Sequence, residues 1–207
     1  MRRLITGLAA ALALAALPAL ANDTSAELAA GGLVLTQDAD IEMRSEDLFI
    51  SRDQVVVKYR FFNTAARDKT IRVAFPMPEM EFSESPLPAL TEDPANLLGF
   101  ATTVDGRPVA AEVEQKATRD GVDVTARLKA LGVPLAPHLS ATWEAMDALP
   151  EAERERLVAD ELAFIQEYDQ GDGKGMQRHL FPRWKLSTIF HWEQTFPAGR
   201  ELAVEHR

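Results

Sequence analysis

Alternation of apolar and polar residues near both ends of the chain constrains this fold more than any other feature. Over residues 55–61, Tyr59 and Phe61 share one face with two valines, while Lys58 and Arg60 fall on the other. A second alternating run over 70–75 follows a turn-like segment at 63–69. Alternation with a period of two is typical of half-buried strands. The two runs therefore predict an antiparallel pair.

The same alternation returns after residue 184. Pro197, Ala198 and Gly199 then form a predicted turn, and a last alternating segment runs to the end of the chain. Shorter strands are expected at 33–36, 41–43 and 48–51, and the pair Asp105-Gly106 predicts a tight hairpin turn. The residues that share one face of the late strand are Trp184, Leu186, Thr188, Phe190, Trp192 and Phe196.

The middle of the chain, residues 124–175, changes to helical spacing. Ser140 and Pro150 suit helix starts. Leu157, Val158, Leu162 and Ile165 trace one apolar stripe, which predicts a helix that continues through all four positions, and Gly171, Gly173 and Gly175 end it. The predicted fold class is mainly β (α+β): an antiparallel β-sandwich or sheet with a helical insertion.

The N-terminus has the composition of a secretory signal peptide. Arg2 and Arg3 precede an uncharged, mostly apolar run over 4–17, and Ala19 and Ala21 occupy the small-residue positions before a cleavage site. The run is shorter than the ~20 apolar residues that span a membrane, so no stable membrane anchor is expected after cleavage. We expect residues 1–21 to be removed and the mature protein to act in the periplasm.

Residues 22–207 are then expected to form a single domain, with β-rich parts at 31–116 and 184–207 around the insertion. Removal of Arg2 and Arg3 leaves 20 basic and 32 acidic residues, a formal net charge of -12. Such a surface repels phosphate backbones, so nucleic acid is not an expected partner. The chain has no cysteine, which excludes disulfides, thiolate nucleophiles and iron–sulfur clusters.

Several stretches resemble an exported proteobacterial family known as domain of unknown function 4424. They are Ser25 to Leu33, Glu42 to Ser51, Tyr59 to Asn63, Ala74 to Pro78 and Trp192 to Gly199. The resemblance implies no activity and no site residues. Members of that family tend to continue further, which agrees with a chain truncated within its last strand. The layout from Phe62 to Pro78 has a more distant likeness to β-sandwich modules that precede von Willebrand-type domains.

Motifs for catalysis or cofactor binding are scarce. The sequence has no Gly-x-Ser-x-Gly elbow, no Ser-x-x-Lys and no phosphate-binding loop. The histidines, His138, His179, His191 and His206, lack the i,i+4 spacing of helical metal ligands, and the last two and His138 are expected at outward strand or loop positions. The loop 169–175, with Asp172, lacks the third acidic ligand of a calcium loop. We therefore expect no metal and no cofactor.

Two further groups are candidate binding residues. Glu42, Glu46 and Asp47 form an expected acidic turn between two short strands, which could dock a partner or confine carboxylates for acid–base chemistry. Solvated turn residues are the simpler interpretation. Of the three tryptophans, only Trp143 is expected at the surface, whereas Trp184 and Trp192 belong to the core.

The leading hypothesis is a non-catalytic module that binds another envelope protein, with the helical insertion as its recognition element. Two alternatives stay open. One is a carboxylate- or metal-dependent hydrolase of an envelope polymer, built on Glu46, Asp47, Asp172 and the histidines. The other is a small-ligand carrier with a cavity inside the sandwich.

Overall fold

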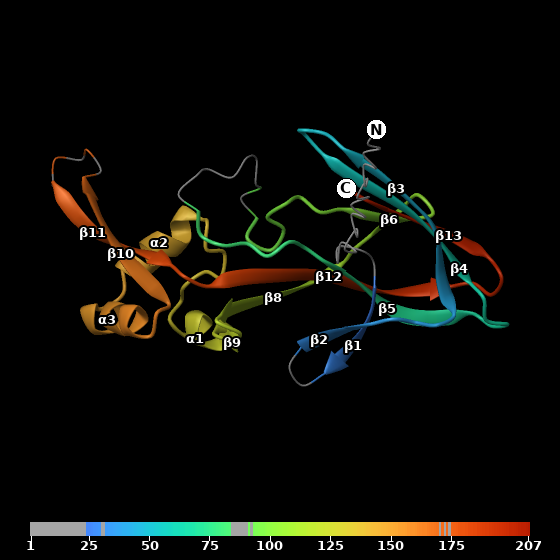
Figure 1. Cartoon of the computed structure of the whole chain (residues 1–207), viewed down its shortest axis with the longest axis horizontal. Coiled ribbons are helices and arrows are strands. Elements are labelled where there is room, and N and C mark those ends of the chain that lie inside the picture. Colours follow the sequence, from blue (N-terminus) through green and yellow to red (C-terminus); the bar gives the residue numbers. More distant parts are fainter. Residues whose placement is uncertain are drawn as a thin grey trace, which may run out of the picture.

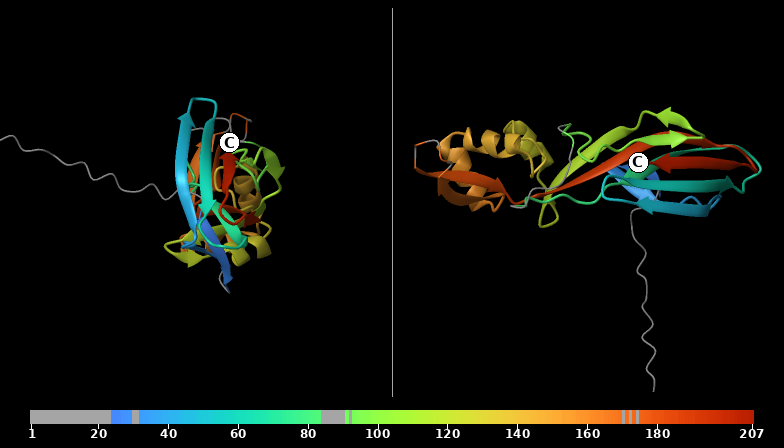
Figure 2. Two further views of the ribbon diagram at one scale, coloured as in Figure 1. Left: turned by 90° about the vertical axis from the view of Figure 1, so that its right-hand side faces the viewer. Right: turned by 90° about the horizontal axis from the view of Figure 1, so that it is seen from above.

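The computed structural model describes residues 24–29, 32–83, 91, 93–169, 171, 173 and 175–207. The predicted signal peptide, with Ala19 and Ala21, lies outside these residues. The molecule is elongated, with a helical unit at one end and two sheets at the other (Figure 1). Seen from above, one long strand, β12, runs from one part into the other (Figure 2). No helix in the described ranges is long and apolar enough to cross a membrane.

Six strands form the larger sheet, in the order β2-β1-β5-β12-β8-β9, and every neighbouring pair is antiparallel. Its central strand β12 pairs with β8 along its first half and with β5 along its second half. The strands are β1 (Thr24–Ala29), β2 (Gly32–Thr36), β5 (Lys69–Pro76), β8 (Glu112–Arg119), β9 (Val122–Asp123) and β12 (Lys185–Phe196).

Five strands form the second sheet, in the order β3-β4-β13-β6-β7, again antiparallel throughout. Asp105 and Gly106 join β6 to β7 with φ of 47° and 74°, as the predicted tight hairpin turn requires. The strands are β3 (Ile41–Ile50), β4 (Val55–Asn63), β6 (Thr102–Val104), β7 (Arg107–Val109) and β13 (Glu201–His206).

The main core of this part combines residues from both sheets. Tyr59 and Phe61 of β4 belong to the same buried cluster as Val73 of β5 and Trp192 and Phe196 of β12. The alternating face recognised in the sequence is thus the face that each sheet turns toward the other. The prediction of a mainly antiparallel β fold with a helical segment is confirmed.

The predicted pairing of the 55–61 strand with the 70–75 strand is wrong. β4 pairs with β3 and β13, whereas β5 pairs with β1 and β12, so the two strands lie in different sheets. Asn63, which is fully buried, ends β4 at the point where the chain crosses over. Alternation shows which face of a strand is buried but not which strand lies beside it. The sequence therefore suggested that each strand pairs with the next one along the chain.

The helical insertion is shorter than predicted and includes a hairpin. The helices are α1 (Thr125–Ala130), α2 (Ser140–Asp147) and α3 (Glu151–Ala159). After α3, Glu161 adopts a φ of 56° and the N–H of Leu162 bonds back to the carbonyl of Leu157, which ends the helix. Ile165, placed on a helix by its spacing, lies instead in β10 (Ala163–Asp169), which pairs with β11 (Met176–Pro182).

The apolar side chains of the helices are used within this unit. Leu128, Met146 and Leu157 come one from each helix and are fully buried together with Leu180 and Trp184. A helix of this size is stabilised mainly by burying such a stripe. The helical unit therefore has its own core and leaves no apolar stripe of these helices for a partner.

Candidate partner-binding edge strand

β3 is one continuous strand where the sequence indicated two short ones. Its pairing with β4 shifts by one residue between Met43 and Ser45, a β-bulge that takes up Arg44. Glu42, Glu46 and Asp47 were expected in a turn, and this is wrong, because all three lie within the strand. The bulge explains the difference, since one extra residue breaks the apparent alternation while pairing continues on both sides of it.

β3 is also the terminal strand of its sheet. It pairs with β4 along one edge, and no described strand pairs with the other (Figure 1). An open edge of this kind carries unpaired N–H and C=O groups that can accept an added strand. Nine of its ten residues are exposed, from Glu42 to Ile50.

Large apolar side chains concentrate at the distal end of this strand. Leu48, Phe49 and Ile50 are 52%, 53% and 66% exposed, and Val55 across the hairpin is 50% exposed. With Met43, they make up five of the nine exposed large hydrophobic residues in the described part of the chain. Natural edge strands more often carry charges or prolines, so an apolar edge indicates an interaction surface.

The register shows which sides of β3 these groups occupy. Leu48 lies opposite Val57 and Ile50 opposite Val55, so both lie on the face of the sheet that becomes core further along β4. Their exposure means that the opposing sheet does not cover this end of the hairpin. Phe49 points to the outer face, beside Val56, where a shallow depression of about 420 Å³ opens. The end of β3 is therefore apolar on both faces.

The charge of β3 is negative and partly unpaired. Glu42 forms an ion pair of 2.9 Å with Arg44, and the guanidinium of Arg44 lies 4.3 Å from the ring centroid of Phe62. Within the described residues, Glu46 and Asp47 have no ion pair. Two free carboxylates next to an apolar end favour a partner with basic and apolar residues.

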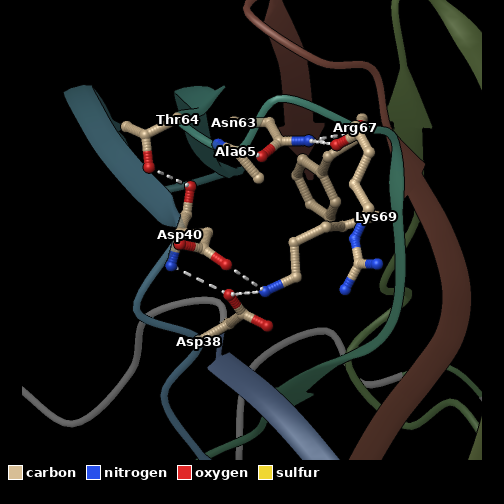
Figure 3. A network of polar contacts seen from close by, with 8 residues as sticks. Asp38, Asp40, Asn63, Thr64, Ala65, Arg67 and Lys69 are labelled. Carbon is tan, nitrogen blue, oxygen red and sulfur yellow. Dashed lines mark hydrogen bonds and ion pairs between the residues drawn. The ribbon is translucent and has the colours of Figure 1, made fainter.

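A polar network fixes the start of β3 (Figure 3). Lys69 Nζ lies 2.6 Å from Asp38 Oδ1 and 2.7 Å from Asp40 Oδ2, and Thr64 donates its backbone N–H to the Asp40 carbonyl over 2.8 Å. Burial would by itself raise the pKa of Asp38. The hydrogen bonds from Lys69 and from the Asp40 N–H, with the lysine charge, outweigh burial and lower it. The hydrogen bonds to Asp38 and Asp40 raise the pKa of Lys69.

The chain matches the model of one known protein family. A model of a domain of unknown function, DUF4424, matches residues 21–207. The chain belongs to the DUF4424 family. No curated protein matches it. A solved structure of a candidate nutrient-binding protein from Legionella pneumophila is similar at 18% identity, with a TM-score of 0.40. That match covers 89% of this chain and 40% of the Legionella chain, so this DUF4424 chain spans less than half of that protein's length.

The other candidate residues are dispersed in this DUF4424 chain. His191 and His206, expected on outward faces, are buried, and His206 lies among the rings of Tyr59, Phe75, Phe100 and Trp192. No three His, Asp or Glu side chains in the described ranges could hold a metal ion. The possible calcium loop is the connection between β10 and β11, and its Asp172 lies outside the described residues.

Trp143, expected at the surface, is half-buried. Its ring packs edge-on against Phe82 and Phe181, and its indole N–H donates to the Pro137 carbonyl over 3.0 Å. Sequence reasoning also missed the apolar end of β3. The signal was present, because Leu48, Phe49 and Ile50 are consecutive and a strand with one buried face would alternate.

Proposed function

We propose that this protein is an exported, non-catalytic module that binds an extended segment of another envelope protein along β3. The observation that carries the proposal is the run of exposed Leu48, Phe49 and Ile50 on an open strand edge. Addition of a strand to such an edge supplies main-chain hydrogen bonds, while alternate side chains supply specificity. The proposal moves the recognition element from the helical unit, whose apolar stripe is buried, to β3.

The chemistry of β3 specifies the partner segment. On the face shared with the core, Leu48 and Ile50 favour apolar partner residues, and Glu46 favours a basic one. On the outer face, Asp47 has no ion pair among the described residues and favours lysine or arginine. The expected partner is a strand-forming segment with two adjacent basic residues, opposite Glu46 and Asp47, next to three apolar residues, opposite Leu48, Phe49 and Ile50.

A second copy of the chain fits this edge less well. If two β3 strands paired antiparallel in the register centred between Glu46 and Asp47, Glu46 of each copy would lie opposite Asp47 of the other. Like charges directly opposite each other destabilise a strand pair. We therefore expect the mature protein to stay monomeric while it binds a heterologous segment.

The test uses the mature chain and a short fluorescent peptide in which three consecutive valines lie next to two consecutive lysines. We expect saturable binding, measured by fluorescence anisotropy, and slower hydrogen exchange of the β3 amides in the complex. A peptide with two glutamates in place of the two lysines should not bind, because it places carboxylates against Glu46 and Asp47. High salt should weaken binding only in part, since strand pairing and apolar burial remain.

Matched variants locate the site. Leu48→Lys and Ile50→Lys remove exposed apolar groups from β3, whereas Val122→Lys and Met176→Lys do the same at exposed positions on other strands. We expect the first two to abolish binding and the last two to retain it. If all four variants bind the lysine peptide equally, β3 is rejected as the site. It is also rejected if the unmodified chain binds the glutamate peptide as well as it binds the lysine peptide.

A further inference from the structure

A second cleft lies where the β10–β11 hairpin meets the segment that follows β5. It has a volume of about 250 Å³, and its lining includes Phe82, Phe164, Arg119 and Arg183. These residues lie far from β3 in the chain and belong to the helical end of the molecule or its junction with the larger sheet (Figure 1). The cleft is therefore independent of the proposed strand-binding edge.

One wall of the cleft is aromatic. The rings of Phe82 and Phe164 are 5.7 Å apart in an edge-to-face arrangement, and both side chains are half-buried. Phe181, which is buried, contacts both rings from behind at 4.8 Å and 5.8 Å. The two outer rings are thus held by packing and keep part of their surface open to a ligand.

Arg183 provides a cation at this wall. Its guanidinium lies 5.3 Å from the Phe164 ring centroid, and its backbone is fixed by a 2.9 Å hydrogen bond to the Leu162 carbonyl. The side chain is exposed, and no carboxylate of the described residues forms an ion pair with it. Stacking on a ring leaves the edge of a guanidinium free for a bidentate anion.

The neighbouring charges are already paired, which singles out Arg183. Arg119 lies 3.3 Å from Glu161, and it also donates to the Arg183 carbonyl. Glu81, another lining residue, lies 2.7 Å from Lys185. In a chain with a net charge of -10, a cation beside two open rings that pairs with no carboxylate of the described residues is an unusual combination.

We infer that this cleft binds a small monocarboxylate with a flat apolar face, which stacks on Phe82 and Phe164 while its carboxylate pairs with Arg183. A single negative charge matches Arg183, the guanidinium of this cleft that has no ion pair among the described residues. A dianionic phosphate fits less well, because Glu81 lines the cleft and Glu161 lies beside Arg119. The volume suits one ring with its carboxylate. Aromatic acids and uronic acids both offer this combination, since a sugar ring also has an apolar face.

The experiment is an NMR titration of the ¹⁵N-labelled mature chain with benzoate and, separately, with D-glucuronate. Benzyl alcohol and D-glucose serve as the uncharged counterparts, and phenyl phosphate as the dianion. The backbone amides of Arg183 and Trp184, two residues that line the cleft, report binding. We expect saturable shifts with at least one acid, with a Kd on the order of 1 mM for so small a ligand. The acid that binds distinguishes the two sources.

Variants separate the two parts of the site. Arg183→Gln should weaken binding roughly tenfold or more through loss of the charge-assisted pair. Arg200→Gln, at another exposed arginine, should leave it unchanged. Phe164→Leu keeps the site apolar but removes the stacking surface, and should also weaken binding. An unchanged spectrum with both acids, equal binding of the uncharged counterparts, tighter binding of phenyl phosphate, or full binding by Arg183→Gln would each overturn the inference.

Discussion

The side-chain amide of Asn63 donates a hydrogen bond of 2.8 Å to the carbonyl oxygen of Phe196. Asn63 ends β4 in one sheet, and Phe196 ends β12 in the other, so a single side chain joins the two sheets at the crossover. The same amide donates to the Arg67 carbonyl over 2.9 Å, and its oxygen accepts the Ala65 N–H. This corner sends β5 away from β4 and leaves β3 as the open edge.

Asn63→Ala should lower the free energy of unfolding by roughly 2–4 kcal/mol, because it removes the donor to the Phe196 carbonyl, a buried bond, and the donor to the Arg67 carbonyl, a part-buried one. Urea unfolding followed by circular dichroism measures this. Thr64→Ala is the matched control, since its hydroxyl makes one exposed hydrogen bond, to the Asp40 carbonyl. An equal loss for both variants would contradict the structural role given to Asn63.

The contribution of the Lys69 network should depend on pH in a defined way. The pKa of Asp38 is lowered, so the stability that this carboxylate contributes to the fold is present above the ordinary value of 3.8. That contribution is lost as the pH falls through the folded-state pKa. The pKa of Lys69 is raised, so the stability that this ammonium group contributes to the fold is fully present below 10.5. That contribution is lost as the pH rises through the folded-state pKa. We expect Lys69→Met to be less stable than wild type across the range between these limits.

The difference in unfolding free energy between Lys69→Met and wild type should close toward acid pH, as Asp38 becomes protonated, and also at strongly alkaline pH, as Lys69 loses its proton. Thermal melts at a series of pH values measure this. Lys58→Met is a suitable comparison, because its ion pair with Glu205 is exposed and spans 4.0 Å. A gap that stays constant from acid to alkaline pH would show that the charges of the network do not contribute.

Asp147 should be important for holding the hairpin against α2. Its carboxylate bonds to His179 Nδ1 over 2.7 Å and accepts the Leu180 N–H over 2.8 Å. Asp147→Ala is expected to cost about 1–3 kcal/mol and to speed exchange of the Leu180 amide. Glu144→Ala, on the exposed side of α2, should have little effect. Unchanged Leu180 exchange in Asp147→Ala would contradict this link.

The apolar end of β3 should not contribute to folding. Leu48→Lys and Ile50→Lys are expected to change the free energy of unfolding by no more than about 0.5 kcal/mol, as at other exposed positions. Val57→Lys, opposite Leu48 but buried, should prevent stable folding. Denaturant midpoints for the three variants test this. A large loss for Leu48→Lys would mean that the side chain packs in the fold and does not serve a partner.

Much of the β structure and of the core could be predicted from periodicity. Leu186, Thr188, Phe190, Trp192 and Phe196, which share parity in the sequence, are all buried in β12, although β12 also buries His191 of the opposite parity. Asp105-Gly106 forms the predicted hairpin turn between β6 and β7. The candidate residues Glu42, Glu46 and Asp47 were expected in a turn, whereas they lie within β3. The β-bulge at Arg44 made β3 resemble two short strands in the sequence, because a bulge interrupts the alternation while the pairing with β4 continues on both sides of it.

The sequence by itself determined which residues are buried in most strands, where α2 and α3 begin, and the acidic charge, because these follow from local periodicity and composition. Tertiary structure alone decided that β4 and β5 belong to different sheets, that Ile165 lies in a strand, and that β3 is an open edge. Each of these depends on which distant segment supplies the hydrogen-bonding partner. Side-chain alternation specifies the face of a strand and carries no information about its neighbour.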